Sequence, residues 1–343
     1  MNSRIRDNVV AMAAYVPGEQ PSDPAIVKLN TNENPYPPAP GVLEVLRAAG
    51  EAGLRLYPDP LCLRLRESIA RLHGCSVEQV FCGNGSDEVL ALCIRAFVPD
   101  GGRIGCFVPS YSVYPVLADA AGVFTATLPL APDFSWPAIP RDYEVPLFFW
   151  TNPNAPTGLR CDAEVIRRWA ARTGGVVVVD EAYVDFATAD CSRLALEAPN
   201  VLVTRTLSKS YSLAGIRLGY ALGPAELIGA LNKIKDAYNV NGLTQLLARA
   251  AIEDQSHMRA NAKRIIATRE RIAAALRERG WEVFASEANF LWIRPPHEPA
   301  ETVLQQLRER GVLVRHFAAA RTRAYLRVTV GSDAQMDAFL AAL

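Results

Sequence analysis

The sequence is poor in several features that mark particular classes of protein. Its 343 residues carry no net charge, which argues against nucleic acid or an anionic membrane surface as the main partner. The four histidines lie far apart and form no metal-binding motif, and the seven cysteines have no CxxC spacing. No segment approaches the roughly 20 apolar residues of a membrane span. These absences favour a reduced, cytoplasmic protein without a metal, whose cysteines lie mostly in its core.

The N-terminal segment has two arginines ahead of a short apolar run. Asp7 and Asn8 interrupt this run, so an amphipathic helical arm is a better interpretation than a secretory signal peptide. A Pro-rich tract, NENPYPPAP, then separates the arm from the body of the chain.

Four short apolar runs predict β-strands, at Arg103–Val108, Pro146–Trp150, Gly175–Asp180 and Asn200–Thr206. The last three have no polar alternation, as is typical of strands buried on both faces. A helix is predicted between them at Asp162–Arg172, with Asp162 as its N-cap. We therefore expect an α/β fold with a mostly parallel central sheet covered by helices.

Beyond about residue 230 a long helical pattern leads into further strands, which indicates a smaller α+β part. The expected division is an arm at residues 1–40 that contributes to the small domain and to dimer contacts, a large domain at 41–235 and a small domain at 236–343.

A polar cluster follows each of five strand-like runs. GNGSDE follows QVFC, SYSVY follows CFVP, TNPNAPTG follows PLFFW, DEAYVD follows VVVV, and LSKS follows VLVTRT. Ligands of open parallel sheets bind beyond the carboxyl ends of the strands. We therefore expect the five clusters to form one site.

Lys209 stands alone among small and hydroxyl side chains in TRTLSKSYSLAGIRLG. Lysine occurs only at positions 28, 209, 233, 235 and 263, and arginine supplies most of the positive charge. A lysine buried among polar groups loses its proton more readily and suits Schiff-base chemistry. A lysine paired with a neighbouring carboxylate is the alternative.

Asp180 ends a strand of four valines, where it is either a cap or a deliberate charge partner. A cofactor with a basic ring nitrogen, such as pyridoxal phosphate, needs such a partner. Tyr183 could donate a hydrogen bond to the ring oxygen, or it could be a core aromatic whose hydroxyl is satisfied.

The segment GNGSDE joins a strand to a helix, and the amides of a helix N-terminus attract phosphate. The segment matches neither common nucleotide-binding signature, because no GKS or GKT follows it and the third glycine of GxGxxG is missing. A simple glycine turn with a Ser or Asp cap is therefore the alternative. Thr206, Ser208 and Arg217 could complete a phosphate cup. Tyr111 could stack on a planar ring, although an ordinary buried tyrosine fits its position equally well.

Together these segments resemble the class I and II aminotransferases, which are pyridoxal 5'-phosphate enzymes of fold type I. SKSYSLAGIRLG is similar to the lysine motif of that family, and the others follow in family order: YPDP, GNGSDE, NPNAPTG, VVVDEAYVDF, YNVNGLTQ and YLRVTVG. The combination is most similar to the histidinol-phosphate branch, which implies transamination between histidinol phosphate and 2-oxoglutarate in histidine biosynthesis. An aromatic amino-acid aminotransferase and a threonine-phosphate-type decarboxylase remain alternatives. A non-catalytic regulatory module is disfavoured because the chain shows no basic helix-turn-helix extension.

The resemblance implies a role for each matching position. Lys209 would hold the cofactor and move the substrate proton, Asp180 would pair with the ring nitrogen, and Tyr183 would bond the ring oxygen. Further cofactor contacts are implied for Gly85, Ser86, Asp87, Tyr111, Thr206, Ser208 and Arg217. Tyr57 would reach the phosphate of the cofactor in the partner subunit, so a homodimer is expected to complete the site.

The sequence departs from the family pattern at one position. The family usually has an asparagine immediately before PTG, where it bonds the ring oxygen, and here that position is Ala155. Asn154 or Asn152 would then bond the ring oxygen in its place, or Tyr183 would bond that oxygen without an asparagine beside it.

The resemblance also implies that Arg327 and Arg315 bind the anionic groups of small-molecule substrates. The alternative is that they are surface or edge-strand arginines. The resemblance further implies that Asn241 in YNVNG faces the substrate.

Overall fold

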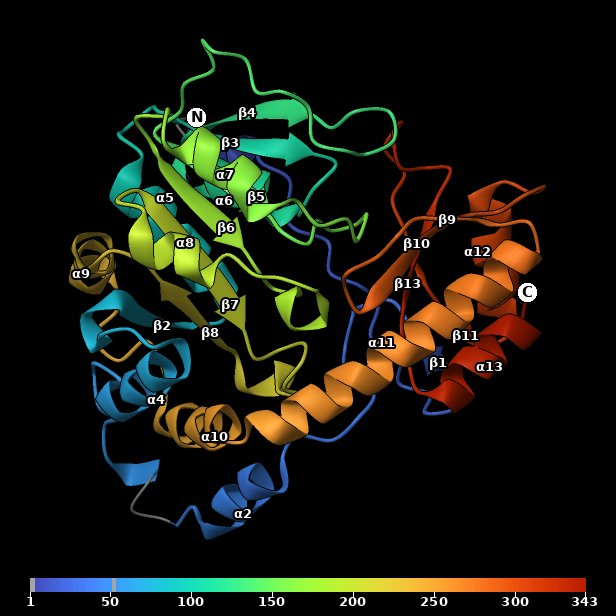
Figure 1. Cartoon of the computed structure of the whole chain (residues 1–343), viewed down its shortest axis with the longest axis horizontal. Helices are drawn as coiled ribbons and strands as arrows, with labels where there is room; N and C mark the ends of the chain where they lie inside the picture. The colour runs from blue at the N-terminus through green and yellow to red at the C-terminus, as the bar shows by residue number, and fades with distance from the viewer. Residues whose placement is uncertain (1–3, 51–53) are drawn as a thin grey trace.

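A computed structural model describes residues 4–50 and 54–343 of the chain. Its main feature is a seven-stranded sheet in the order β2-β8-β7-β6-β5-β3-β4 (Figure 1). The strands are β2 Val80–Asn84, β3 Arg103–Val108, β4 Phe124–Pro129, β5 Leu147–Thr151, β6 Val176–Asp180, β7 Val201–Thr206 and β8 Leu218–Leu222. Only β8 runs antiparallel to its neighbours β2 and β7, so the mostly parallel sheet expected from the sequence is confirmed.

Helices cover both faces of this sheet, as the continuous apolar strands require. Along β6, Val177 and Val179 pack on one face and Val178 on the other, because successive side chains of a strand alternate. The face of Val178 is covered by α5 Ser86–Phe97, α6 Val113–Ala121 and α9 Ala225–Ile234. The opposite face is covered by α4 Leu63–His73, α7 Ala163–Ala170 and α8 Ser192–Glu197. The side chain of Asp162 accepts a hydrogen bond from the Glu164 amide at 2.8 Å, which confirms the predicted cap of α7.

A second, four-stranded antiparallel sheet lies in the C-terminal part, in the order β12-β13-β10-β9. Its strands are β9 Glu282–Val283, β10 Phe290–Arg294, β12 Arg315–His316 and β13 Leu326–Thr329. The long α11 Gln255–Glu278 runs from the first sheet to the second, where α12 Ala300–Glu309 and α13 Asp333–Ala341 also pack (Figure 1). The preceding α10 Gly242–Glu253 packs instead on α2 Pro40–Ala48 and α4. We keep the division at residues 40 and 235 as a proposal.

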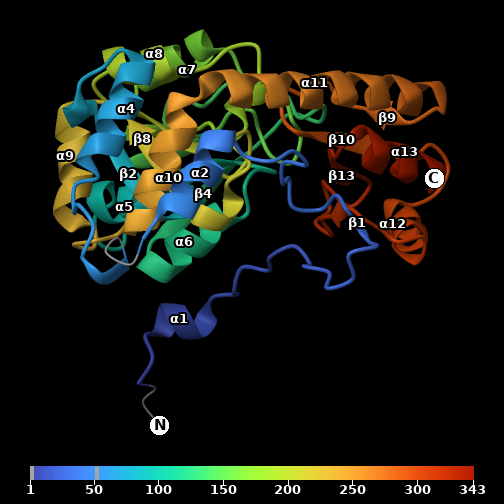
Figure 2. The same cartoon turned by 90° about the horizontal axis from the view of Figure 1, so that it is seen from below.

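From residue 4 to the start of α2 at Pro40, the N-terminal arm is helical only in α1 Asp7–Ala11, which is less helix than expected (Figure 2). The three prolines at positions 17, 21 and 24 lack the amide hydrogen that a longer helix needs. After this extended segment, β1 Val27–Lys28 pairs in parallel with β11 Val312–Leu313. The arm therefore joins the C-terminal part of the structure after passing close to the large sheet.

None of the helices described is long and apolar enough to cross a membrane. Among residues 4–50 and 54–343, no group of three or more histidine, cysteine, aspartate or glutamate side chains could hold a metal ion. All seven cysteines are free thiols.

Candidate active site

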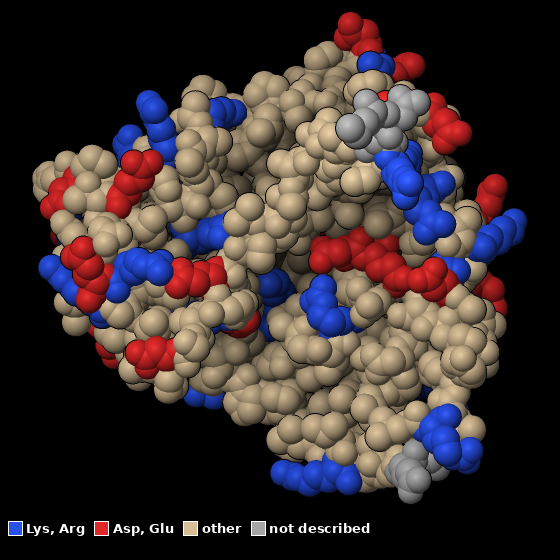
Figure 3. Space-filling model, turned by 180° about the vertical axis from the view of Figure 1, so that it is seen from behind, with Lys and Arg blue, Asp and Glu red and all other residues tan. Residues whose placement is uncertain are grey.

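One cavity of about 240 Å³ opens at the carboxyl ends of the strands β2, β3, β5, β6 and β7. All five polar clusters contribute to its wall, which includes Ser86 and Asp87, Ser110 to Ser112, Thr151 and Ala155, Asp180, Ala182 and Tyr183, and Thr206, Ser208 and Lys209. The structure therefore brings the five clusters together around one cavity, as expected from the sequence. The face of the molecule in Figure 3 is hollowed at its centre, and basic side chains gather in this hollow.

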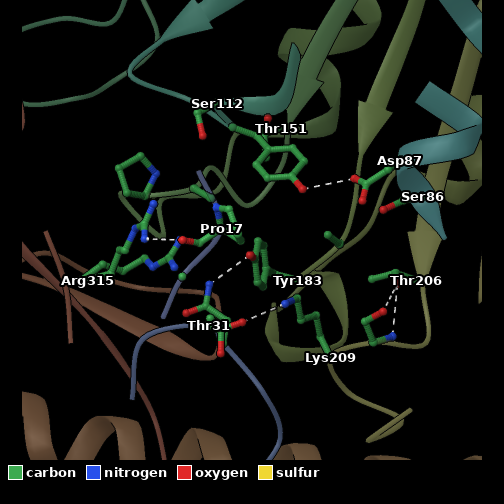
Figure 4. A pocket seen from close by; sticks show the side chains of 18 of the residues that line it. Pro17, Thr31, Ser86, Asp87, Ser112, Thr151, Tyr183, Thr206, Lys209 and Arg315 are labelled. Atoms are coloured by element: carbon green, nitrogen blue, oxygen red, sulfur yellow. Dashed lines mark hydrogen bonds between the residues drawn. The ribbon is translucent and has the colours of Figure 1, made fainter. Parts of the chain in front are cut away.

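Lys209 is half-buried in the cavity wall, just beyond the end of β7. Its Nζ donates a hydrogen bond to the carbonyl oxygen of Thr31 at 3.1 Å and lies 5.8 Å from the ring centre of Tyr183 (Figure 4). Burial, reinforced by the positive charge of Arg327, lowers the pKa of Lys209 to about 8. No ion pair to Lys209 occurs in the described part of the chain, so the structure favours a reactive amine over a salt-bridged one.

Asp180 ends β6 with only 2% of its surface exposed. One carboxylate oxygen accepts a hydrogen bond from the Tyr114 hydroxyl at 2.8 Å, and the other accepts one from the Ala182 amide at 3.3 Å. Burial raises the pKa of Asp180 to about 6, because the charged form loses solvation. A protonated ring nitrogen in the cavity would supply the opposite charge that this carboxylate lacks.

At one end of the cavity, the first turn of α5 presents backbone amides beside hydroxyls and a guanidinium. Arg217 lies 3.5 Å from the Ser208 hydroxyl and 3.3 Å from the Asp87 carboxylate. Gly85 precedes the helix with φ +82°, and a Cβ there would come within 2.7 Å of Arg217. A Cβ on Gly219 would lie 2.3 Å from the Ser86 amide nitrogen. Both glycines thus allow the close packing that forms a cradle of anion-binding groups.

Tyr111 lines the cavity and donates a hydrogen bond from its hydroxyl to Asp87 at 3.1 Å. Its ring stands edge-on to the ring of Tyr114 at 5.5 Å. The stacking of Tyr111 on a cofactor ring stays a prediction.

The structure does not bring Asn154 or Asn152 into the cavity beside Ala155. Asn154 donates to the Pro109 carbonyl and the Thr157 hydroxyl, and Asn152 donates to the Cys161 carbonyl and accepts from its amide. Both side chains hold the loop together and are buried in doing so. The cavity wall at this point is formed by Ala155 and Pro156.

Arg315 and Arg327 are directly opposite each other in the β12–β13 pair, and both line the cavity. Arg327 donates to the Asn30 carbonyl at 3.0 Å, while its buried Nε has no hydrogen-bond partner. Burial lowers the pKa of Arg327 below its ordinary value. Arg315 donates to the backbone carbonyls of Val16 and Pro17 in the arm. Neither guanidinium has a carboxylate partner within the described ranges, so a substrate anion would fill that role.

Tyr57 and Asn241 lie outside this cavity, beside a separate surface groove. Tyr57 is 81% exposed and stacks on Tyr238 with 4.5 Å between ring centres. Asn241 caps α10 by accepting a hydrogen bond from the Thr244 amide at 2.9 Å. Within one chain, therefore, Tyr57 and Asn241 do not reach the cavity that contains Lys209.

Several cavity residues escaped the sequence analysis because they come from the arm. Tyr15, Asn30, Thr31 and Asn32 all line the cavity although they precede the large sheet in sequence. The tract NENPYPPAP, which begins at Asn32, was interpreted only as a boundary between parts of the chain.

The groups present fit pyridoxal phosphate well. The cavity holds a half-buried amine with a lowered pKa, a buried carboxylate and an anion cradle at the N-terminus of α5. Fold and site together define a pyridoxal-phosphate-dependent enzyme of fold type I.

Comparisons with known proteins give the family. The model of the family "Aminotransferase class I and II" matches residues 24–343, and the chain belongs to this family. It is 45% identical over 340 residues to a histidinol-phosphate aminotransferase of Geotalea uraniireducens, covering 99% of this chain and 98% of the relative. It is 48% identical over 346 residues to "Histidinol-phosphate aminotransferase 2" of Thiobacillus denitrificans, covering 98% and 95%. A solved histidinol-phosphate aminotransferase from Sinorhizobium meliloti, in complex with pyridoxal-5'-phosphate, matches with a TM-score of 0.90 at 26% identity, covering 100% and 97%.

Proposed function

We propose that this enzyme catalyses the reversible transamination between histidinol phosphate and 2-oxoglutarate, a reaction of histidine biosynthesis, in the cytoplasm. The observation that carries the proposal is the pair of adjacent guanidinium groups, Arg315 and Arg327, without carboxylate partners in the described chain and on the same cavity as Lys209. Histidinol phosphate carries a phosphate and 2-oxoglutarate carries two carboxylates, and a guanidinium binds either anion with two parallel hydrogen bonds. The names of the relatives at 45% and 48% identity support the same substrate.

Each of three cavity residues has a separate role in transamination. Bound pyridoxal phosphate supplies an aldehyde that links to amines and a ring that accepts electrons from the substrate. Lys209 would hold the cofactor through its amine and, in the neutral form, would take a proton from the carbon that carries the amino group and return one on the cofactor side. Asp180 keeps the ring nitrogen protonated, and Arg327 orients the substrate by its anionic end.

The proposal is tested with a substrate panel on the purified, cofactor-loaded protein, measuring glutamate formed from 2-oxoglutarate. Histidinol phosphate should be the best amino donor, ahead of histidinol and phenylalanine. Because charged hydrogen bonds are lost, Arg327→Gln should lower kcat/KM for histidinol phosphate by about 10- to 100-fold and hardly affect histidinol.

A faster reaction with phenylalanine would identify an aromatic amino-acid aminotransferase instead. Release of carbon dioxide without any amino acceptor would identify a decarboxylase.

We further propose that two chains form a homodimer in which Tyr57 reaches the partner's cavity. The supporting observation is an exposed apolar surface around the groove of Tyr57. Its large apolar side chains are at least 45% exposed: Leu54, Leu56 and Tyr57 line the groove, and Tyr238 stacks on Tyr57. Contiguous apolar surface of this kind marks interaction sites.

Mixed dimers test this arrangement. Tyr57→Ala should weaken each site by about 10-fold or more, because a hydrogen bond to a charged phosphate is lost. Coexpressing Tyr57→Ala with Lys209→Ala should restore roughly a quarter of wild-type activity, since half of the dimers then carry one intact site. No recovery in a confirmed mixed dimer would show that Tyr57 does not act across the interface.

A further inference from the structure

The cavity wall beside the expected ring oxygen is where this chain departs from its family. Ala155 stands in place of the usual asparagine, and its methyl group can donate no hydrogen bond. Asn154 and Asn152 are engaged within the loop, as described above. Tyr183 therefore has to serve the ring oxygen without that asparagine.

A different asparagine contacts Tyr183 from the arm. Asn32 lines the cavity, is 1% exposed, and its Nδ2 donates a hydrogen bond to the Tyr183 hydroxyl oxygen at 3.0 Å. A phenol oxygen that accepts a hydrogen bond in this way keeps its own proton free for another acceptor. With an acceptor in the place of Nδ2, the phenol proton would turn toward the arm instead.

The orientation of the Asn32 amide follows from its other contacts. The Thr329 hydroxyl accepts a hydrogen bond from the Asn32 backbone amide at 2.9 Å, so its single proton is available to the Asn32 Oδ1, 3.0 Å away. This identifies Oδ1 as the acceptor and leaves Nδ2 facing Tyr183. Asn289 also donates to the Asn32 carbonyl at 3.0 Å. Strand β13 and its surroundings thus hold Asn32 in one orientation, at a φ of +58° that asparagine tolerates.

We propose that Asn32 is a positioning residue that compensates for Ala155 by directing the Tyr183 proton toward the ring oxygen of the cofactor. A hydrogen bond donated to that oxygen stabilises its negative charge. The nitrogen that links Lys209 to the cofactor then loses its proton at a lower pH. This inference rests on the cofactor of the family and not on the proposed substrate.

The test is a pH titration of the visible absorption of the cofactor-loaded protein, without substrate. Asn32→Gly keeps the left-handed backbone accessible and removes the amide. It should raise the titration midpoint by about 0.5 to 1 pH unit, since one hydrogen bond is lost. The isosteric Asn32→Asp should raise it further, because its carboxylate accepts the Tyr183 proton and adds a negative charge. Midpoints unchanged in both variants would overturn the proposal.

Two further variants separate this role from a structural one. In a Tyr183→Phe background, Asn32→Gly should cause no additional shift, because the pair acts as a unit. In the Asn32→Gly background, Ala155→Asn should move the midpoint back down by supplying a new donor. Melting temperatures are recorded for every variant. An Asn32 that only stabilises the fold would lower the melting temperature while leaving the midpoint in place, and Ala155→Asn would then rescue nothing.

Discussion

Replacing Lys209 with alanine is expected to lower kcat/KM for transamination by about 10⁴-fold, because one side chain supplies both the covalent anchor and the proton shuttle. Lys209→Arg should be equally inactive, since a guanidinium stays protonated and cannot act as a base. Glutamate formation from histidinol phosphate and 2-oxoglutarate is the measurement. Lys263→Ala is the matched control, because that lysine is exposed and lies away from the cavity.

The lowered pKa of Lys209, about 8, gives this prediction a pH signature. Below that pH the amine is mostly protonated and cannot attack an aldehyde. The rate at which the cofactor-free protein captures pyridoxal phosphate should therefore rise about tenfold per pH unit up to pH 7 and level off above about 8. Borohydride reduction followed by peptide mapping should place the cofactor on Lys209. A label on another lysine, or none, would refute the assignment.

The parts of the site that could be predicted from sequence are those that depend on local pattern. Unbroken apolar runs identify strands buried on both faces, and a parallel sheet gathers the residues after its strands at one edge. Lys209 and Asp180 could be predicted as candidates on this basis, because Asp180 ends β6 and Lys209 lies three residues beyond the end of β7.

The remaining parts depend on contacts between distant segments. Asn32 and Tyr183 are 151 positions apart, and nothing in the local pattern of either indicates their hydrogen bond. Asn154 was assigned by its nearness to Ala155, but adjacent loop residues point in different directions, and its amide holds the loop closed. For Asn241, a position just before a helix predicts a cap as readily as a substrate contact.

A pair of buried charges elsewhere in the sheet shows how the fold supports the site. Glu181 follows Asp180 directly, and its buried carboxylate binds Arg205 of β7 at 2.8 Å. Its other oxygen accepts a hydrogen bond from the Cys191 amide. This network lies on the side of the sheet away from the cavity residue Asp180, and it fixes the backbone of neighbouring strand ends. The chain thereby positions Asp180 without neutralising it.

Asp180→Asn is the second substitution expected to have a large effect, with kcat lowered by about 10³-fold. An amide cannot keep the ring nitrogen protonated, so the ring would accept electrons poorly. Loss of the charged hydrogen bond should also weaken cofactor binding by about 10- to 100-fold, measured by fluorescence titration. Asp180→Glu should retain part of the activity, and Asp162→Asn, which preserves an exposed helix cap, should retain all of it.

Stability should respond to Asp180→Asn in the opposite direction to activity. Burial raises the pKa of Asp180 to about 6, above its ordinary value of 3.8, so without cofactor the unfolded chain binds fewer protons than the folded one between these values. Stability therefore falls as pH rises through that window, and at pH 7 the charged carboxylate destabilises the cofactor-free fold. The cofactor-free Asp180→Asn protein should accordingly melt at the same or a higher temperature than wild type. A marked loss of thermal stability would instead mean that Asp180 serves the fold, and its proposed role toward the ring nitrogen would lose its physical basis.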